Sequence, residues 1–235
     1  MMLDTLGALT VGGVAAAVLA AIVGSLSNPL PSRLTFATLA GAWIALIAVV
    51  STGGFLERPA GIPVMFATPL IVAAVLAALF PGFRATVGRI PVPVIIGLNV
   101  FRVAGLWFVL LALAGRLSGP FPYVAGIGDI LTGLGAIPAA RIAAAAGAND
   151  PRVLAWNAFG FLDLLVAVTL GVVSRTGSPV QVIHAGVGSA AISTLPWSLI
   201  PLALVPVFLI GHIVVFAHAR SQRAAATQAG TVMTA

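Results

Sequence analysis

Three scarcities limit what this chain can be. It has no cysteine, which excludes disulfides, thiolate metal sites, iron–sulfur clusters and cysteine nucleophiles. It has no lysine, so it cannot hold retinal through a Schiff base. It also has no phosphate-binding P-loop motif with which this chain could use ATP. Only 7% of the residues are charged and 60% are apolar, whereas a soluble domain carries roughly 25% charged residues. Lipid must therefore surround most of the molecule, and we predict an all-α, polytopic integral membrane protein.

Apolar runs long enough to cross about 30 Å of hydrocarbon occur seven times. Turn-forming residues, mainly proline, glycine and asparagine, separate most of them. The predicted spans are 6–26, 34–53, 61–81, 91–116, 122–142, 152–174 and 195–219. No basic segment precedes the first run, so we expect a retained span and not a cleaved signal peptide.

The distribution of arginine predicts the orientation. With the N-terminus outside, the cytoplasmic segments contain seven arginines and the outer segments three, an excess that fits the positive-inside rule. The cytoplasmic set is Arg33, Arg84, Arg89, Arg141, Arg152, Arg220 and Arg223, and the outer set is Arg58, Arg116 and Arg175. We therefore expect a multi-pass protein of the cell inner membrane with a cytoplasmic C-terminus. The net charge of +6 is explained by this topology and does not indicate nucleic acid as a partner.

We predict one transmembrane domain over residues 1–220 and a disordered cytoplasmic tail over 221–235, because the tail is rich in Ser, Gln, Ala and Thr. The longest connection, 175–194, is expected to be a flexible loop, with a lid or a short surface helix as the alternative. A possible internal repeat relates the second and third spans to the sixth and seventh: Trp43 to Gly53 resembles Leu165 to Gly177. This gives a three-plus-one-plus-three arrangement, which in layout alone resembles small sugar facilitators.

Three charged residues fall inside predicted spans. Arg102 and Asp163 lie near the middle of the fourth and sixth spans, and Asp129 lies in the outer third of the fifth. A single charge at the bilayer centre costs at least about 2.5–3.5 kcal/mol, so we expect these three to pair inside the bundle. Asn99 precedes Arg102 by three residues and could add an amide partner. The pairing either fixes helix register or forms a polar ligand or ion site.

One arginine against two acids leaves an uncompensated carboxylate. Arg102 is expected within salt-bridge reach of Asp163 or Asp129. If the protein is a proton-coupled carrier, Asp163 is the favoured partner of Arg102, and Asp129, without a dedicated cation, is expected to carry the proton. Trp156 and Asn157 could stack on and hydrogen-bond a ligand, or simply join helices. His212 is expected to make a hydrogen-bonded helix contact or to touch the ligand. The histidines are too scattered to predict a haem or a metal site, and we expect no cofactor.

The run Gly126-Ile127-Gly128-Asp129 is similar to the Gly-X-Gly-Asp signature of intramembrane aspartyl proteases, in which a second aspartate completes a pair around one water. Two features argue against that activity. Asp163 follows the motif, whereas the presenilin-like order places the other aspartate before it. Arg102 would also keep both acids ionised, whereas the pair needs one protonated. A stripe of small residues for helix packing is the alternative explanation of the glycines.

No catalytic residue is assigned, and whether the chain is an enzyme stays open. The favoured function is a facilitative or proton-coupled carrier for a small solute. A membrane-embedded enzyme or ligand-binding sensor using the same pocket is the alternative, and a structural subunit is a third. The expected partners are the lipid bilayer and an unidentified small molecule, and a homo-oligomer or a larger membrane complex stays open. The candidate ligand residues are Asn99, Arg102, Asp129, Trp156, Asn157, Asp163 and His212.

Overall fold

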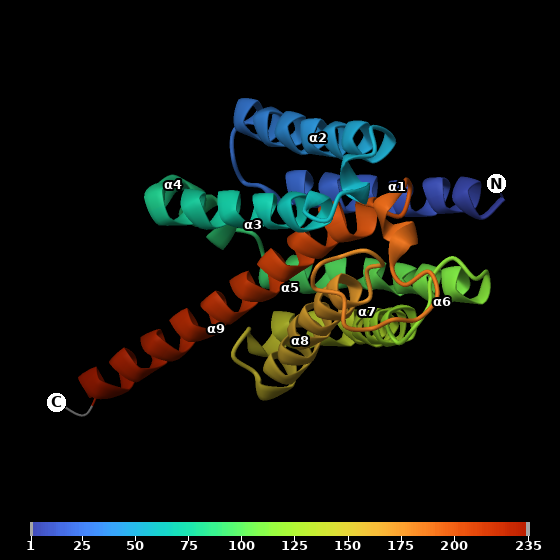
Figure 1. Ribbon diagram of the computed structural model, residues 1–235. Helices are drawn as coiled ribbons and strands as arrows, with labels where there is room; N and C mark the ends of the chain where they lie inside the picture. The colour runs from blue at the N-terminus through green and yellow to red at the C-terminus, as the bar shows by residue number, and fades with distance from the viewer. Residues whose placement is uncertain (1, 234–235) are drawn as a thin grey trace.

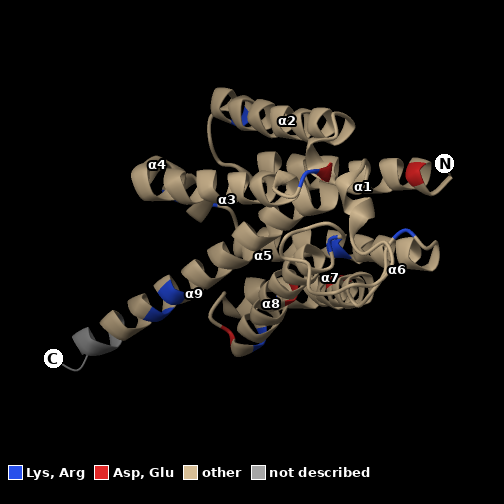
Figure 2. Cartoon of the chain, viewed as in Figure 1, with Lys and Arg blue, Asp and Glu red and all other residues tan. Residues whose placement is uncertain are grey.

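The computed structural model describes residues 2–233, and within them all regular structure is helical (Figure 1). Seven helices are long and apolar enough to cross a membrane, which confirms the predicted seven-span, all-α membrane protein. They are α1 (Met2–Ser25), α2 (Leu30–Thr52), α3 (Gly61–Leu79), a composite fourth span (Val92–Leu113), α7 (Phe121–Ala146), α8 (Pro151–Val173) and a composite seventh span (Ile200–Gln228). Charged residues are sparse along these helices (Figure 2).

Proline determines where several helices begin. Proline occupies the first turn of α7 and α8, where its missing N–H removes no hydrogen bond and its fixed φ suits the helix. Asp150 precedes α8, and its carboxylate accepts a hydrogen bond from the Arg152 backbone N–H at 2.8 Å. The hydrogen bond from the Arg152 side chain lowers the pKa of Asp150 to about 2. Proline also begins α4 (Pro81–Gly88), a short helix that lies mostly between the third and fourth predicted spans.

The fourth span is not a uniform α-helix. It consists of α5 (Val92–Gly97), a 3₁₀ segment η2 (Leu98–Gly105) and α6 (Leu106–Leu113). A 3₁₀ stretch in mid-helix often marks a functional hinge or local strain. This one carries Arg102 at its buried face.

α7 lies at the centre of the bundle, and α2 lies at its edge. α7 packs against α5, η2, α6 and α8, and α8 packs against α9 (Val205–Met233). Figure 1 shows α2 as the outermost helix on one side, and Ile47 is its single buried residue. The core that positions the site is therefore built by the spans from the fourth onward, with α3 covering one face.

The seventh span is irregular where two prolines interrupt it. It opens with a π-helical segment, η4 (Ile200–Leu204), which contains Pro201, and Pro206 follows in α9. Because Pro206 has no N–H, the Leu202 carbonyl lacks the donor that an α-helix normally supplies four residues later. The Trp43 indole N–H of α2 donates to that carbonyl at 2.9 Å. A peripheral helix thus supplies a donor to a carbonyl whose usual α-helical donor the proline removes.

Replacing Trp43 with phenylalanine should lower the free energy of unfolding by about 1–3 kcal/mol, because a buried carbonyl loses its donor. The cost should shrink when Pro206→Ala is combined with it, since an alanine at that position supplies a backbone N–H. Unfolding in mixed micelles measures both effects. Trp107→Phe is the control, since Trp107 contacts the Trp197 ring without a described hydrogen bond. If Trp43→Phe lowers the free energy of unfolding equally in the parent and in the Pro206→Ala background, the bond to Leu202 does not compensate for the proline.

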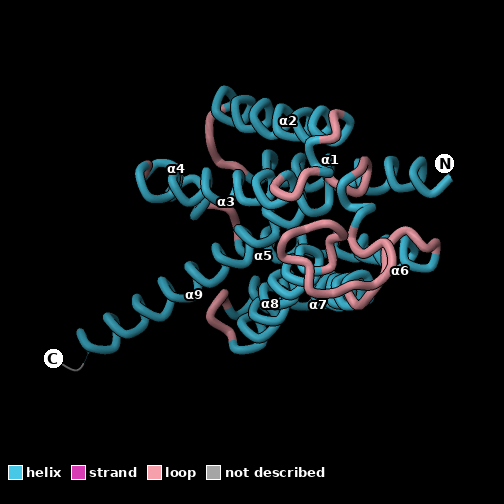
Figure 3. Tube along the Cα trace, viewed as in Figure 1, coloured by secondary structure: helices cyan, strands magenta, loops and turns pink. Residues whose placement is uncertain are grey.

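The connection after α8, predicted to be a loop, is mostly loop (Figure 3), and side-chain hydrogen bonds tie it to neighbouring segments. It contains three glycines at positive φ, Gly177, Gly186 and Gly188, and a short 3₁₀ turn, η3 (Ala190–Ser193). Ser118 donates to the Ala185 carbonyl and accepts from the Gly188 N–H. Ser189 donates to the Gly171 carbonyl at 2.7 Å. These bonds could not be anticipated because their partners are far apart in sequence.

The tail also differs from expectation. α9 continues to Met233 in place of the disordered segment predicted from 221, and residues 234–235 lie outside the described part. The start of the tail contains Arg, Gln and an alanine run, all good helix formers. The apolar span provides a helix already nucleated, and extending one is far easier than starting one.

Between α2 and α3 the chain turns back into the bundle through η1 (Phe55–Glu57). Gly54 adopts φ 72°, a conformation that glycine reaches without strain. This turn brings the Leu56 and Arg58 carbonyls to the loop after α8, where they become part of the candidate site.

Candidate functional site in the helix bundle

Arg102 is the centre of a buried polar cluster. Its Nε donates to Asp129 Oδ1 at 2.7 Å, and its Nη2 donates to Asp163 Oδ2. Its Nη1 donates to the Gly160 carbonyl at 3.0 Å and lies 3.2 Å from His212 Nε2. Four of the five guanidinium N–H groups can thus be paired. A single side chain joins η2 to α7, α8 and α9.

The hydrogen bonds around His212 establish its tautomer. Asn157 Nδ2 donates to the His212 carbonyl at 3.1 Å, so Asn157 Oδ1 is free to accept from His212 Nδ1 at 2.8 Å. With the proton on Nδ1, the lone pair of Nε2 accepts from Arg102. His212 is therefore neutral in this arrangement. The Trp156 ring lies 5.5 Å from the His212 ring, and its N–H donates to the Thr132 carbonyl at 3.1 Å.

Close helix approach at two glycines makes this geometry possible. At Gly128 of α7, a Cβ would overlap the Asp163 carboxylate. At Gly160 of α8, a Cβ would lie 2.7 Å from His212 Cε1 and 2.8 Å from Thr132 Cγ2. Small residues at helix interfaces in membranes allow such approach. The glycine-rich motif around Asp129 thus serves to bring α8 close to α7.

The structure brings together all the predicted site residues except Asn99. It changes two expectations, one on the partner of Asn99 and one on the partner of Asp129. Asn99 is buried but donates to the Ile95 carbonyl at 3.1 Å and makes no described bond to Arg102. The i, i+3 spacing places Asn99 on the same face as Arg102. Its short side chain instead bonds a backbone carbonyl four residues earlier in the same span. Asp129 does have a cation, because Arg102 is long enough to bond both acids at once. The expectation that Asp163 alone would pair with Arg102 is therefore wrong.

A guanidinium between the two acids also bears on the protease signature. Arg102 bonds both Asp129 and Asp163, whereas an aspartyl pair shares one water and one proton between its carboxylates. Among residues 2–228, no three His, Cys, Asp or Glu side chains are grouped so that they could hold a metal ion.

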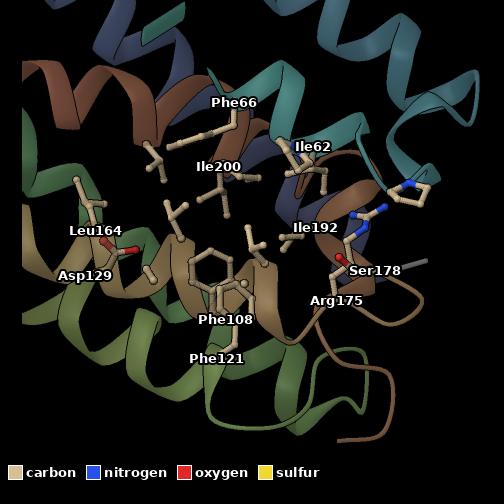
Figure 4. A pocket seen from close by; sticks show the side chains of 18 residues that line it. Ile62, Phe66, Phe108, Phe121, Asp129, Leu164, Arg175, Ser178, Ile192 and Ile200 are labelled. Atoms are coloured by element: carbon tan, nitrogen blue, oxygen red, sulfur yellow. The ribbon is translucent and has the colours of Figure 1, made fainter. Parts of the chain in front are cut away.

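A mostly apolar cavity of about 70 Å³ extends from Asp129 between α3, α6, α7, α8 and the seventh span (Figure 4). Asp129 lies at one end, and Arg175 and Ser178 lie at the other. The lining residues are Pro59, Ile62, Pro63, Phe66, Phe108, Phe121, Asp129, Leu164, Ala167, Val168, Gly171, Val172, Arg175, Ser178, Ile192, Ile200, Pro201 and Val205. The sequence does not reveal this cavity, since its walls are ordinary apolar residues from distant segments.

A second, smaller cavity of about 20 Å³ reaches both Arg102 and Asp129. One water molecule needs at least about 10–15 Å³ and a polar wall, so this space fits a single water. Asp129 borders both cavities. It is therefore the residue through which the charge cluster faces the larger cavity. Trp156, Asn157 and His212 border neither of these two cavities.

Arg175 forms the far end of the larger cavity. Its guanidinium donates to Ser193 Oγ at 2.9 Å and to the Leu56 and Arg58 carbonyls. Burial lowers the pKa of Arg175, and the nearby Glu57 carboxylate opposes that shift. An arginine nevertheless stays protonated. The side chain ties the turn before α3 to the loop after α8.

With His212 neutral, the cluster holds one positive and two negative groups. Its net charge is −1 if both acids are ionised. An uncompensated charge in this environment is costly, so the arrangement favours one further positive charge, either a proton or a cation.

Comparison with known proteins gives a family but no activity. No curated protein and no solved structure matches the chain. Residues 59–220 match a domain of unknown function, DUF8737. The matched region begins just before α3 and ends within α9, so it contains every residue of the polar cluster and of the larger cavity. Because the match covers well over half of the sequence, the chain belongs to the DUF8737 family of domains of unknown function.

Proposed function

We propose that this protein is a carrier that moves a small solute across the membrane through the cavity next to Asp129. The observation that supports it most is a cavity inside a seven-helix bundle that ends on a charged cluster near mid-span. Pro63 of α3 and Pro201 of the seventh span both line this cavity. Pro63 lies in the first turn of α3, whereas Pro201 lies in the π-helical opening of the seventh span. Discontinuous helices at a midplane site are typical of carriers.

Proton coupling follows from the charge of the cluster. Two ionised carboxylates and one guanidinium carry a net charge of −1, so one exchangeable positive charge would neutralise the cluster. Asp129 is the better candidate for binding the exchanged proton because it borders both cavities. Asp163 has no such access to the two cavities and holds α8 against Arg102.

Proteoliposomes containing a pH-sensitive dye test this function. We expect a small cationic, neutral or anionic organic solute to produce a pH change beyond that of empty liposomes. Asp129→Asn should abolish the proton-linked flux, since an amide neither takes nor releases a proton. Asp150→Asn, a change at the start of α8 that borders neither cavity, should behave like the parent. If no solute of any charge gives flux beyond empty liposomes, the carrier function is wrong.

We also propose the orientation, with the N-terminus outside and the C-terminus in the cytoplasm of a cell inner membrane. Seven spans place the termini on opposite faces, and the arginine asymmetry selects the direction. A reporter fused after Ala235 should be active only in the cytoplasm. Activity only on the outer side would reverse the orientation.

A further inference from the structure

We propose that the larger cavity binds a small hydrophobic amine in its protonated form, with the ammonium on Asp129 and the hydrocarbon part along the apolar wall. This substrate class rests on the proposed carrier function but concerns a binding site that can be measured without transport.

The first argument is an unused oxygen on Asp129. The residue is only 6% exposed. Its Oδ1 accepts from Arg102 Nε at 2.7 Å, and no donor from the described part of the chain reaches Oδ2. Oδ2 is not one of the fully buried unpaired side-chain atoms of the described residues, so it is open to a partner from outside the protein. Asp129 borders the cavity, so a donor located there could complete its hydrogen bonding.

The second argument is charge. The groups that face Asp129 are Arg102 from η2 and, beyond it, Asp163 from α8 and His212 from α9. With His212 neutral these sum to −1, and one monovalent cation brings the site to zero. A carboxylate ligand would raise the buried negative charge to −2. A dication would change the net charge of the site from −1 to +1, so an uncompensated charge would remain.

The third argument is the chemistry of the wall. Between Asp129 and Arg175 the surface consists almost entirely of aliphatic and phenyl groups. An alkyl chain loses water there favourably, at about 0.8 kcal/mol per CH₂ group. Arg175 at the other end repels a cation, so it orients the ammonium toward Asp129 (Figure 4). A slim chain suits a cavity of about 70 Å³ better than a bulky ring system.

Three compounds of nearly equal shape test the class: hexylamine, 1-hexanol and hexanoate at neutral pH. Thermal unfolding of the purified protein in detergent is measured as each compound is titrated. We expect saturable stabilisation by hexylamine only. Asp129→Asn should weaken its apparent affinity about ten- to hundredfold, because a charge-assisted hydrogen bond is lost. This variant keeps the Arg102–Asp163 pair and a neutral cluster, so it should still fold.

Asp150→Asn is the matched control, since it removes an aspartate at the start of α8 that borders neither cavity and should leave hexylamine affinity unchanged. Equal stabilisation by 1-hexanol, no stabilisation by hexylamine, or full affinity in Asp129→Asn would each overturn the proposed class. Hexylamine binding without flux of any tested solute in proteoliposomes would keep the site and reject the carrier function. Flux of a neutral or anionic solute without hexylamine binding would keep the carrier function and reject the amine.

Discussion

Replacing Arg102 with methionine is expected to destabilise the protein by about 3–5 kcal/mol, the usual effect of removing one partner of a buried ion pair. The loss would leave Asp129 and Asp163 as two buried acids without a cation, and would free the Gly160 carbonyl and His212 Nε2 from their donor. Unfolding in mixed micelles, followed by circular dichroism, measures the change in the free energy of unfolding.

A triple variant separates orphaned charge from lost packing. Arg102→Met combined with Asp129→Asn and Asp163→Asn leaves no buried charge, so it should recover a large part of the stability. Arg152→Met is the control for removing an arginine, because its pair with Asp150 lies at the surface and should matter little. If the triple variant is less stable than Arg102→Met alone, the three charges are not acting as one cluster.

Replacing Gly128 with alanine is expected to lower the free energy of unfolding by at least about 2 kcal/mol. The new methyl group would occupy the position of the Asp163 carboxylate. Either α8 moves away from α7 or Asp163 leaves Arg102, and overpacking and loss of a buried ion pair each have a cost in this range. The same unfolding measurement applies.

Gly12→Ala in α1 is the matched control, because a Cβ there meets nothing within 4 Å. It should leave stability unchanged or raise it by up to about 1 kcal/mol, since alanine is the better helix former. Similar effects of the two substitutions would show that α7 and α8 are not in close contact at Gly128. Adding Asp163→Ala to Gly128→Ala should reduce the overlap, though it also removes the ion pair.

The seven spans could be predicted from the sequence alone. Long apolar runs can be read directly, because any run that crosses hydrocarbon must satisfy its own backbone as a helix. The residue pattern also indicated that Arg102, Asp129 and Asp163 would meet, because none of these charges is stable alone in lipid. Both results follow from the cost of placing polar groups in hydrocarbon, which depends on residue type and on position along a span.

How those charges are shared, and what lies beside them, became visible only in the packed bundle. That Arg102 bonds both acids, while Asn99 turns back to Ile95, depends on side-chain reach and helix rotation within a fraction of a turn. The apolar cavity and the Trp43 bond to Leu202 join segments that are far apart in the chain. Apolar residues facing lipid and apolar residues facing a cavity have the same composition, so only the packing of the helices distinguishes them.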